Sequence, residues 1–186
     1  MVGEMEERTY RPLHILFHWL TAVLVIGLFG LGLWMTELDY YHAWYHRAPY
    51  WHKVIGVLTA LLLILRLLWR LLKPTPPPAA TSERQRLLAQ SLHAFFYGLI
   101  LTLAVAGYLI ATAKGKAVEL PLGMQLPALV TLSPDWAERM GDWHRWLAYM
   151  LIVLASGHAL MALKHHFIDG LPALRRMLGL SATPRS

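Results

Sequence analysis

Long stretches without any charged residue constrain the fold of this chain more than any other feature. Asp, Glu, Lys and Arg are all absent from residues 12–36, 87–113 and 146–163. Uncharged apolar runs of about 18 or more residues are typical of helices that cross a membrane. A fourth apolar run begins at Val54 and continues past Arg66 to Trp69. We count it as a span because a basic side chain near the membrane surface can reach the interface with its charge.

The composition agrees with a membrane protein and excludes several chemistries. Only 15% of the residues are charged, whereas soluble domains are about 25% charged. The chain has no cysteine, which excludes disulfides, cysteine-bound iron–sulfur clusters and covalently attached c-type haem. The net charge of +6 comes with basic residues placed beside the spans, so we expect no nucleic-acid partner.

The sequence therefore predicts an all-α membrane protein, a bundle of four transmembrane helices that forms one domain over residues 1–186. After the last span we expect a tail at 169–186 that forms a short interfacial helix or a frayed end. The predicted spans lie at about 13–36, 52–73, 87–113 and 142–166.

The distribution of basic residues between the connections predicts the orientation. Residues 66–86 carry five basic residues and one acidic residue, whereas the connections at 37–53 and 114–141 are balanced. Lysine and arginine are enriched in cytoplasmic connections. We therefore expect both termini and the second connection, with its proline-rich segment at 74–78, in the cytoplasm. The first and third connections then face outward.

Four histidines occur at two matched depths of the predicted bundle. His144 and His158 are fourteen residues apart, which separates them by about 21 Å along the helix and by about 40° around it. His52 opens the second span at the outer depth of His144. His18 lies near the cytoplasmic end of the first span, at the inner depth of His158. These positions predict an outer pair and an inner pair, each joining the fourth span to another span.

Paired imidazoles suit haem iron, which takes an axial ligand on each face, better than zinc, which usually takes three or four protein ligands. Histidines in a membrane are usually functional, although they also join helices by hydrogen bonds. His14 and His93 remain open as alternative ligands at the inner depth. A porphyrin needs space one turn from its ligand, and the residues four positions after the four paired histidines are small: Ala22, Gly56, Ala148 and Ala162.

A set of motifs runs along nearly the whole chain, at residues 11–20 (RPLHILFHWL), 52–56 (HKVIG), 65–70 (LRLLWR), 92–93, 114–118 (KGKAV), 126–127 and 164–167 (KHHF). In order and spacing it resembles the prokaryotic cytochrome b561 family. The resemblance implies a four-helix cytochrome of the bacterial inner membrane that binds two haem b groups. It also implies the axial ligand pairs His18 with His158 and His52 with His144.

One branch of that family is a superoxide oxidase, and similarity to it implies an oxidoreductase that passes electrons from periplasmic superoxide to ubiquinone. Electrons would enter at the outer haem and leave from the inner haem. We expect His165 to bind the quinone and Arg66 to bind a propionate of the inner haem, although each also fits a simple interfacial role. Positive side chains near the outer pair would attract an anion: Lys53, Lys114 and Lys116.

Two other functions fit the same residues. The chain would serve as a haem b relay subunit if a protein in the periplasm, in place of a small molecule, supplied the electrons. A haem-free transporter lined by histidines would instead move metal ions or protons across the bilayer. The colour of the purified protein separates this last function from the first two.

Overall fold

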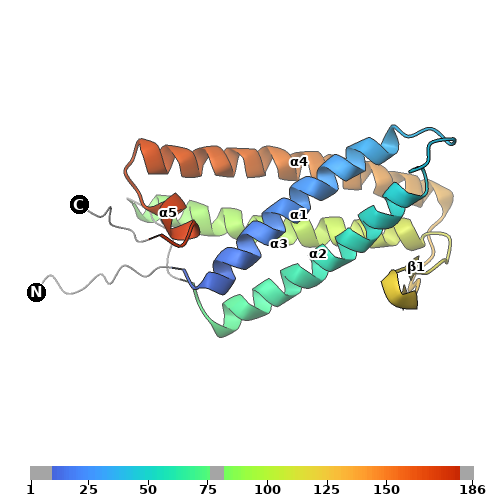
Figure 1. The fold of residues 1–186 in the computed structure, drawn as a ribbon, viewed down its shortest axis with the longest axis horizontal. Helices are drawn as coiled ribbons and strands as arrows, with labels where there is room; N and C mark the ends of the chain where they lie inside the picture. The colour runs from blue at the N-terminus through green and yellow to red at the C-terminus, as the bar shows by residue number, and fades with distance from the viewer. Residues whose placement is uncertain (1–9, 76–81, 181–186) are drawn as a thin grey trace, which may run out of the picture.

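Four long helices run side by side in alternating directions in the computed structural model, which describes residues 10–75 and 82–180 (Figure 1). Each is long and apolar enough to cross a membrane, so the predicted four-helix membrane bundle is confirmed. The prolines at 76–78 and the ends of the chain, which we expect in the cytoplasm, lie outside the described residues. The helices are α1 (Pro12–Thr36), α2 (Arg47–Leu72), α3 (Glu83–Thr112) and α4 (Pro134–Phe167).

Local signals determine where these helices begin and end. α1 begins at Pro12, whose fixed φ suits the first helical position. The hydroxyl oxygens of Ser82 and Ser133 accept hydrogen bonds from the first turns of α3 and α4, as N-caps do. α2 ends two residues before Pro74, because the residue before a proline disfavours helical geometry. The predicted spans included only the apolar part of each helix. Three helices therefore begin several residues earlier than expected, at Arg47, Glu83 and Pro134.

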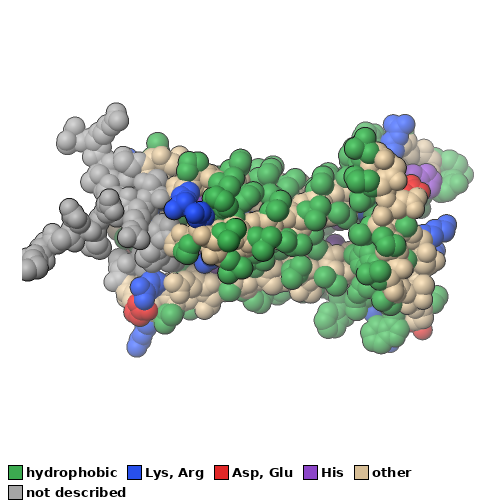
Figure 2. Space-filling model, turned by 90° about the horizontal axis from the view of Figure 1, so that it is seen from below, with side chains coloured by type: hydrophobic (Ala, Val, Ile, Leu, Met, Phe, Trp, Pro, Cys, Tyr) green, Lys and Arg blue, Asp and Glu red, His purple; other side chains and the backbone are tan. Residues whose placement is uncertain are grey.

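The helices close into a bundle because each packs against the next one along the chain and α1 also touches α4. A small apolar core lies between α3 and α4, where Leu99, Leu103 and Leu151 are buried. Many other large apolar side chains point outward. On the face shown in Figure 2, hydrophobic side chains cover the middle of the molecule and charged side chains gather toward its two ends. That exterior suits lipid chains, which are as apolar as leucine.

A small antiparallel hairpin interrupts the third connection. It pairs β1 (Val118–Glu119) with β2 (Gln125–Leu126) through the single turn η1 (Pro121–Gly123). The sequence analysis did not predict this hairpin. The Tyr108 hydroxyl of α3 fixes the next part of this connection, since it donates to the Pro127 carbonyl at 2.7 Å and accepts from the Leu129 N–H at 2.9 Å. We call this side of the bundle the hairpin end.

The opposite side, where α1 begins and α4 ends, is the termini end. A short helix, α5 (Ala173–Met177), lies there against α4, and it matches the short helix expected in the tail. The indole N–H of Trp19 on α1 donates to the Met177 carbonyl at 2.8 Å. This bond ties the last described segment of the chain to the first helix.

Candidate functional site

The histidines predicted as the outer pair meet at the hairpin end. The ring centroids of His52 on α2 and His144 on α4 are 6.2 Å apart, with the ring planes at 72°. Nδ1 of His144 lies 3.1 Å from the Leu103 carbonyl oxygen. A carbonyl can only accept, so this nitrogen carries the proton and the other ring nitrogen, Nε2, keeps a free lone pair. Nε2 of His144 is therefore available to a metal.

Two glycines leave room for these rings. A Cβ built at Gly32 of α1 would come 3.3 Å from Cε1 of His52, and one built at Gly107 of α3 would come 3.2 Å from Cε1 of His144. Contacts this short would force a side chain to shift. A glycine on each neighbouring helix therefore lets the ring of a histidine approach the helix backbone closely.

The histidines predicted as the inner pair meet at the termini end. The ring centroids of His18 on α1 and His158 on α4 are 6.5 Å apart, with the ring planes at 62°. The ring of Trp19 packs edge-on against His18 at 5.4 Å, and the ring of Phe96 packs against His158 at 5.7 Å. Aromatic side chains thus cover both imidazoles of this pair.

Both ring spacings fit one metal atom held between two imidazoles. A metal–nitrogen bond of about 2 Å on each side, with the half-width of each ring added, places the two centroids about 6 Å apart. Nδ1 of His52 is also buried and has no hydrogen-bond partner in the described part of the chain. Within residues 10–75 and 82–180, no group of three or more His, Cys, Asp or Glu residues is placed to hold a metal ion. The donor sets therefore suit bis-histidine haem b.

The two alternative inner ligands occupy different positions. The ring centroid of His93 is 5.3 Å from that of His158, which is closer than two imidazoles on opposite sides of one metal. Nδ1 of His93 lies 2.5 Å from the Ala89 carbonyl oxygen. The ring of His14 packs edge-on against Trp69 of α2 at 6.1 Å. This geometry favours His18 over both as the residue opposite His158.

Arg66, which we expect to bind a propionate of the inner haem, lies beside the inner pair. Its Nη2 is 3.3 Å from Nδ1 of His18. Its guanidinium also stacks over the ring of Tyr97 on α3, at 5.2 Å from the centroid. Sequence reasoning placed the arginine at this depth but missed Tyr97, because no spacing rule relates a residue of α3 to one of α2.

Sequence comparison decides the family to which this geometry belongs. The profile described as prokaryotic cytochrome b561 matches residues 9–180. The chain belongs to the prokaryotic cytochrome b561 family. As a member of this family it transfers electrons across the membrane through haem b, and it is a multi-pass protein of the bacterial inner membrane.

Two curated relatives match this cytochrome over almost its full length. It is 43% identical over 175 residues to "Cytochrome b561 homolog 2" of Escherichia coli (strain K12), which covers 94% of this chain and 93% of the relative. It is 28% identical over 173 residues to "Probable superoxide oxidase CybB" of Yersinia pestis, with 92% and 96% covered. The more similar relative carries no named substrate, and the one named for superoxide is more distant.

His165 of the cytochrome lies at the termini end in a cluster with Lys164 and Asp169. Nδ1 of His165 is 2.6 Å from a carboxylate oxygen of Asp169, and Nζ of Lys164 lies 2.9 Å from the same oxygen. Hydrogen bonds from Lys164 and His165 hold the pKa of Asp169 below its ordinary value of 3.8. The carboxylate therefore stays charged at neutral pH and holds Nδ1 of the His165 ring. Nε2 of this ring has no hydrogen bond to a carboxylate among the described residues.

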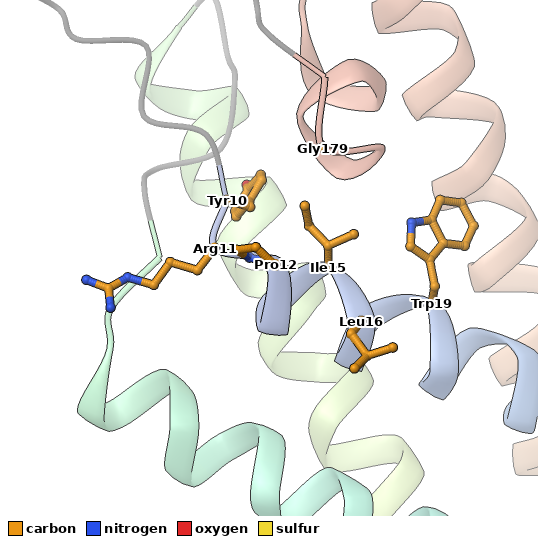
Figure 3. A pocket seen from close by; sticks show the side chains of 7 residues that line it. All are labelled: Tyr10, Arg11, Pro12, Ile15, Leu16, Trp19 and Gly179. Atoms are coloured by element: carbon orange, nitrogen blue, oxygen red, sulfur yellow. The ribbon is translucent and has the colours of Figure 1, made fainter.

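An apolar cleft of about 690 Å³ lies at the same end, beside α1 (Figure 3). Tyr10, Ile15 and Trp19 are directed toward the segment that carries Gly179, whereas Arg11 points away. Burial raises the pKa of the Tyr10 phenol, so this group keeps its proton and can donate a hydrogen bond. Sequence reasoning did not find the cleft, because it forms only where the tail returns to the start of α1. Its lining residues are Tyr10, Arg11, Pro12, Ile15, Leu16, Trp19 and Gly179.

Proposed function

We propose that this cytochrome oxidises a donor on the periplasmic side and reduces ubiquinone on the cytoplasmic side, with one haem b on His52 and His144 and a second on His18 and His158. The observation that carries the proposal is the presence of two imidazole pairs, at 6.2 and 6.5 Å, that each include a histidine of the same transmembrane helix, α4. The two pairs are about 21 Å apart along α4, within a hydrocarbon core about 30 Å thick. They therefore serve opposite sides of the bilayer.

The protein contributes ligation, orientation and a dry environment. Haem b, when bound, supplies one-electron chemistry at its iron. The Leu103 carbonyl holds Nδ1–H of His144 and leaves the lone pair on Nε2, as the outer hydrogen bond of a metal-bound histidine does. Phe96 packs on His158 and shields one side of that ring. These fixed side chains allow transfer without movement of the helices.

Ubiquinone is the acceptor that the termini end fits best. A quinone carries carbonyl oxygens that accept hydrogen bonds and a long apolar tail. Nδ1 of His165 faces Asp169, and in the doubly protonated ring Nε2–H is free to donate to a quinone carbonyl. The volume of the apolar cleft, about 690 Å³, lies within the range of roughly 300–1,000 Å³ that is typical of small-molecule sites. Trp19 lines it and also packs against His18, which brings the cleft close to the inner pair.

Among small-molecule electron donors, superoxide fits the hairpin end. Lys53, Lys114 and Lys116 are exposed and lie at the end where His52 and His144 meet, so they attract an anion toward the outer pair. In the reaction, two superoxide ions each lose one electron and become dioxygen. One ubiquinone gains the two electrons, takes up two protons from the cytoplasmic side and becomes ubiquinol.

The test measures first the haem content and then the reaction. Purified protein should give a b-type reduced-minus-oxidised spectrum and two haems per chain by pyridine haemochrome. Stopped-flow mixing with superoxide and a short-chain ubiquinone should then produce ubiquinol. A colourless protein would reject both the cytochrome sites and the proposed reaction, and two haems without ubiquinol would reject the reaction alone.

A protein donor is the second candidate, and one observation favours it. Tyr40 and Tyr41 in the first connection are 70% and 93% exposed, and exposed aromatic residues are enriched where proteins meet. The chain would then relay electrons from a periplasmic redox protein. Capture of a redox protein that reduces the cytochrome faster than superoxide does would favour this candidate.

A further inference from the structure

Two ring nitrogens between the termini-end halves of α1 and α2 are buried and unpaired. His14 is only 9% exposed, and its ring lies 6.1 Å from that of Trp69 at 74°. Nε2 of His14 and Nε1 of Trp69 both lack a hydrogen-bond partner among residues 10–75 and 82–180. We call the surroundings of these two ring nitrogens the His14–Trp69 pocket.

What the pocket lacks is a hydrogen-bond acceptor. The indole Nε1–H of tryptophan can only donate. A buried donor without an acceptor destabilises a protein, so such groups in native proteins almost always have a partner, which can be a ligand or water. An oxygen of a ligand would satisfy Trp69, and in its Nε2–H tautomer His14 would donate to the same ligand.

The charge around the pocket favours an anionic oxygen. The positive charges of Arg66, Arg11 and Arg70 all act on His14. Neither α1 nor α2 contains an Asp or a Glu, so these helices supply no carboxylate to balance them. A carboxylate held here would pair with the nearby Arg66 and accept from both rings.

The pocket adjoins the inner histidine pair through Arg66. His14 is one helical turn before His18, and Nη2 of Arg66 lies 3.3 Å from Nδ1 of His18. A histidine that binds a metal through Nε2 keeps its proton on Nδ1, so it cannot accept a hydrogen bond from Arg66. When His18 binds a metal, the guanidinium therefore needs a different acceptor close by.

We propose that the His14–Trp69 pocket, together with Arg66, binds a propionate carboxylate of the haem held by His18 and His158. The proposal rests on the proposed function, because it requires that haem. It makes His14 and Trp69 positioning residues that hold the haem by its edge and do not ligate its iron. It also gives a role to the buried ring nitrogens of His14 and Trp69, which belong to neither ligand pair.

The test measures haem retention in the full-length chain. Trp69→Phe removes the indole N–H and keeps an aromatic ring, and His14→Phe removes the imidazole. Trp51→Phe is the matched control, because it makes the same change at the other end of α2. Protein produced without haem is loaded in detergent with haem b or with its dimethyl ester, which lacks both carboxylates. Haem transfer to excess apo-globin is then followed by absorbance.

With haem b, we expect one of the two transfer phases to accelerate about tenfold in Trp69→Phe and in His14→Phe, as for loss of a hydrogen bond to a charged group. Trp51→Phe should match the wild type, and His14→Gln, which keeps a donor, should recover part of the loss. With the dimethyl ester, wild type and variants should transfer it at equal rates.

Three results would overturn this proposal alone, and a fourth would reject the function on which it rests. Equal haem b transfer from wild type and both variants shows that no propionate is bound there. An equal acceleration with haem b and with the ester shows that the rings act by packing alone. Unchanged haem transfer with weaker binding of a short-chain ubiquinone assigns the pocket to the quinone. A wild-type chain that binds a single haem rejects the proposed function itself, and the propionate site with it.

Discussion

Gly107 of α3 lies directly against the imidazole of His144, and a Cβ added at this glycine would come 3.2 Å from Cε1 of the ring. A valine there adds two further methyl groups to a close-packed site, and such overpacking costs about 1–3 kcal/mol. We expect Gly107→Val to displace His144 and to lower the haem content from two haems per chain to one. Pyridine haemochrome analysis of the purified variant measures this content.

Gly98 provides the control for this substitution. It lies on the same helix, and a Cβ at this position would meet nothing within 4 Å in the described part of the chain. Gly98→Val should therefore retain both haems. If Gly107→Val also retains both with an unchanged spectrum, the glycine does not support a haem ligand.

Alanine substitutions of the four paired histidines should fall into two classes. His52→Ala and His144→Ala each remove one ligand of the hairpin-end pair, so both should lose the same haem. His18→Ala and His158→Ala should lose the other haem and leave the first in place. Redox titration followed by absorbance identifies the remaining haem by its midpoint potential. Four different residual spectra would contradict the pairing of the ligands.

The depth of the histidines could be predicted because helix geometry is nearly invariant. A rise of about 1.5 Å per residue is enough to place His144 and His158 at two levels and to match each with a histidine on another span. The rings indeed meet at both levels. Which residues of a third helix face these rings depends on helix rotation, which spacing within one helix does not determine. Neither Gly32 nor Gly107 was therefore predicted as a neighbour of these rings.

The connections were less predictable than the spans. The proline positions indicated where helices stop, but the hairpin formed by β1 and β2 depends on two short segments that have no strand pattern of their own. The partners of the tail were also hidden, since the bond from Trp19 to the Met177 carbonyl joins residues at opposite ends of the sequence. Contacts of this kind arise from the closed bundle and leave no local signal.

Tyr108→Phe should loosen the third connection without changing the haem content. The hydroxyl links α3 to two backbone groups, the Pro127 carbonyl and the Leu129 N–H. Loss of such hydrogen bonds costs about 1 kcal/mol each. Hydrogen exchange measured by mass spectrometry should show faster exchange in residues 125–132. Exchange equal to that of the wild type would mean that other contacts hold this segment.

The docking of α5 should depend on the charge of Asp169. Hydrogen bonds from Lys164 and His165 lower the pKa of this carboxyl from 3.8, so its charged form is favoured in the folded state. The stabilisation is therefore fully present above pH 3.8 and is lost as the pH falls through the lower folded-state pKa. Wild-type protein should show faster hydrogen exchange in residues 170–180 below the folded-state pKa of Asp169, after correction for the intrinsic exchange rate.

Asp169→Asn should show the fast exchange of residues 170–180 already at pH 6, with no further change on acidification, because an amide cannot form the ion pair with Lys164 that the carboxylate forms at 2.9 Å. Asp135→Asn, at the opposite end of α4, is the matched control and should behave as the wild type. If ubiquinol formation also falls in Asp169→Asn while both haems remain, the carboxylate orients His165 toward the quinone. Wild-type exchange in Asp169→Asn at pH 6 would instead show that other contacts, such as the Trp19 bond, hold α5 in place.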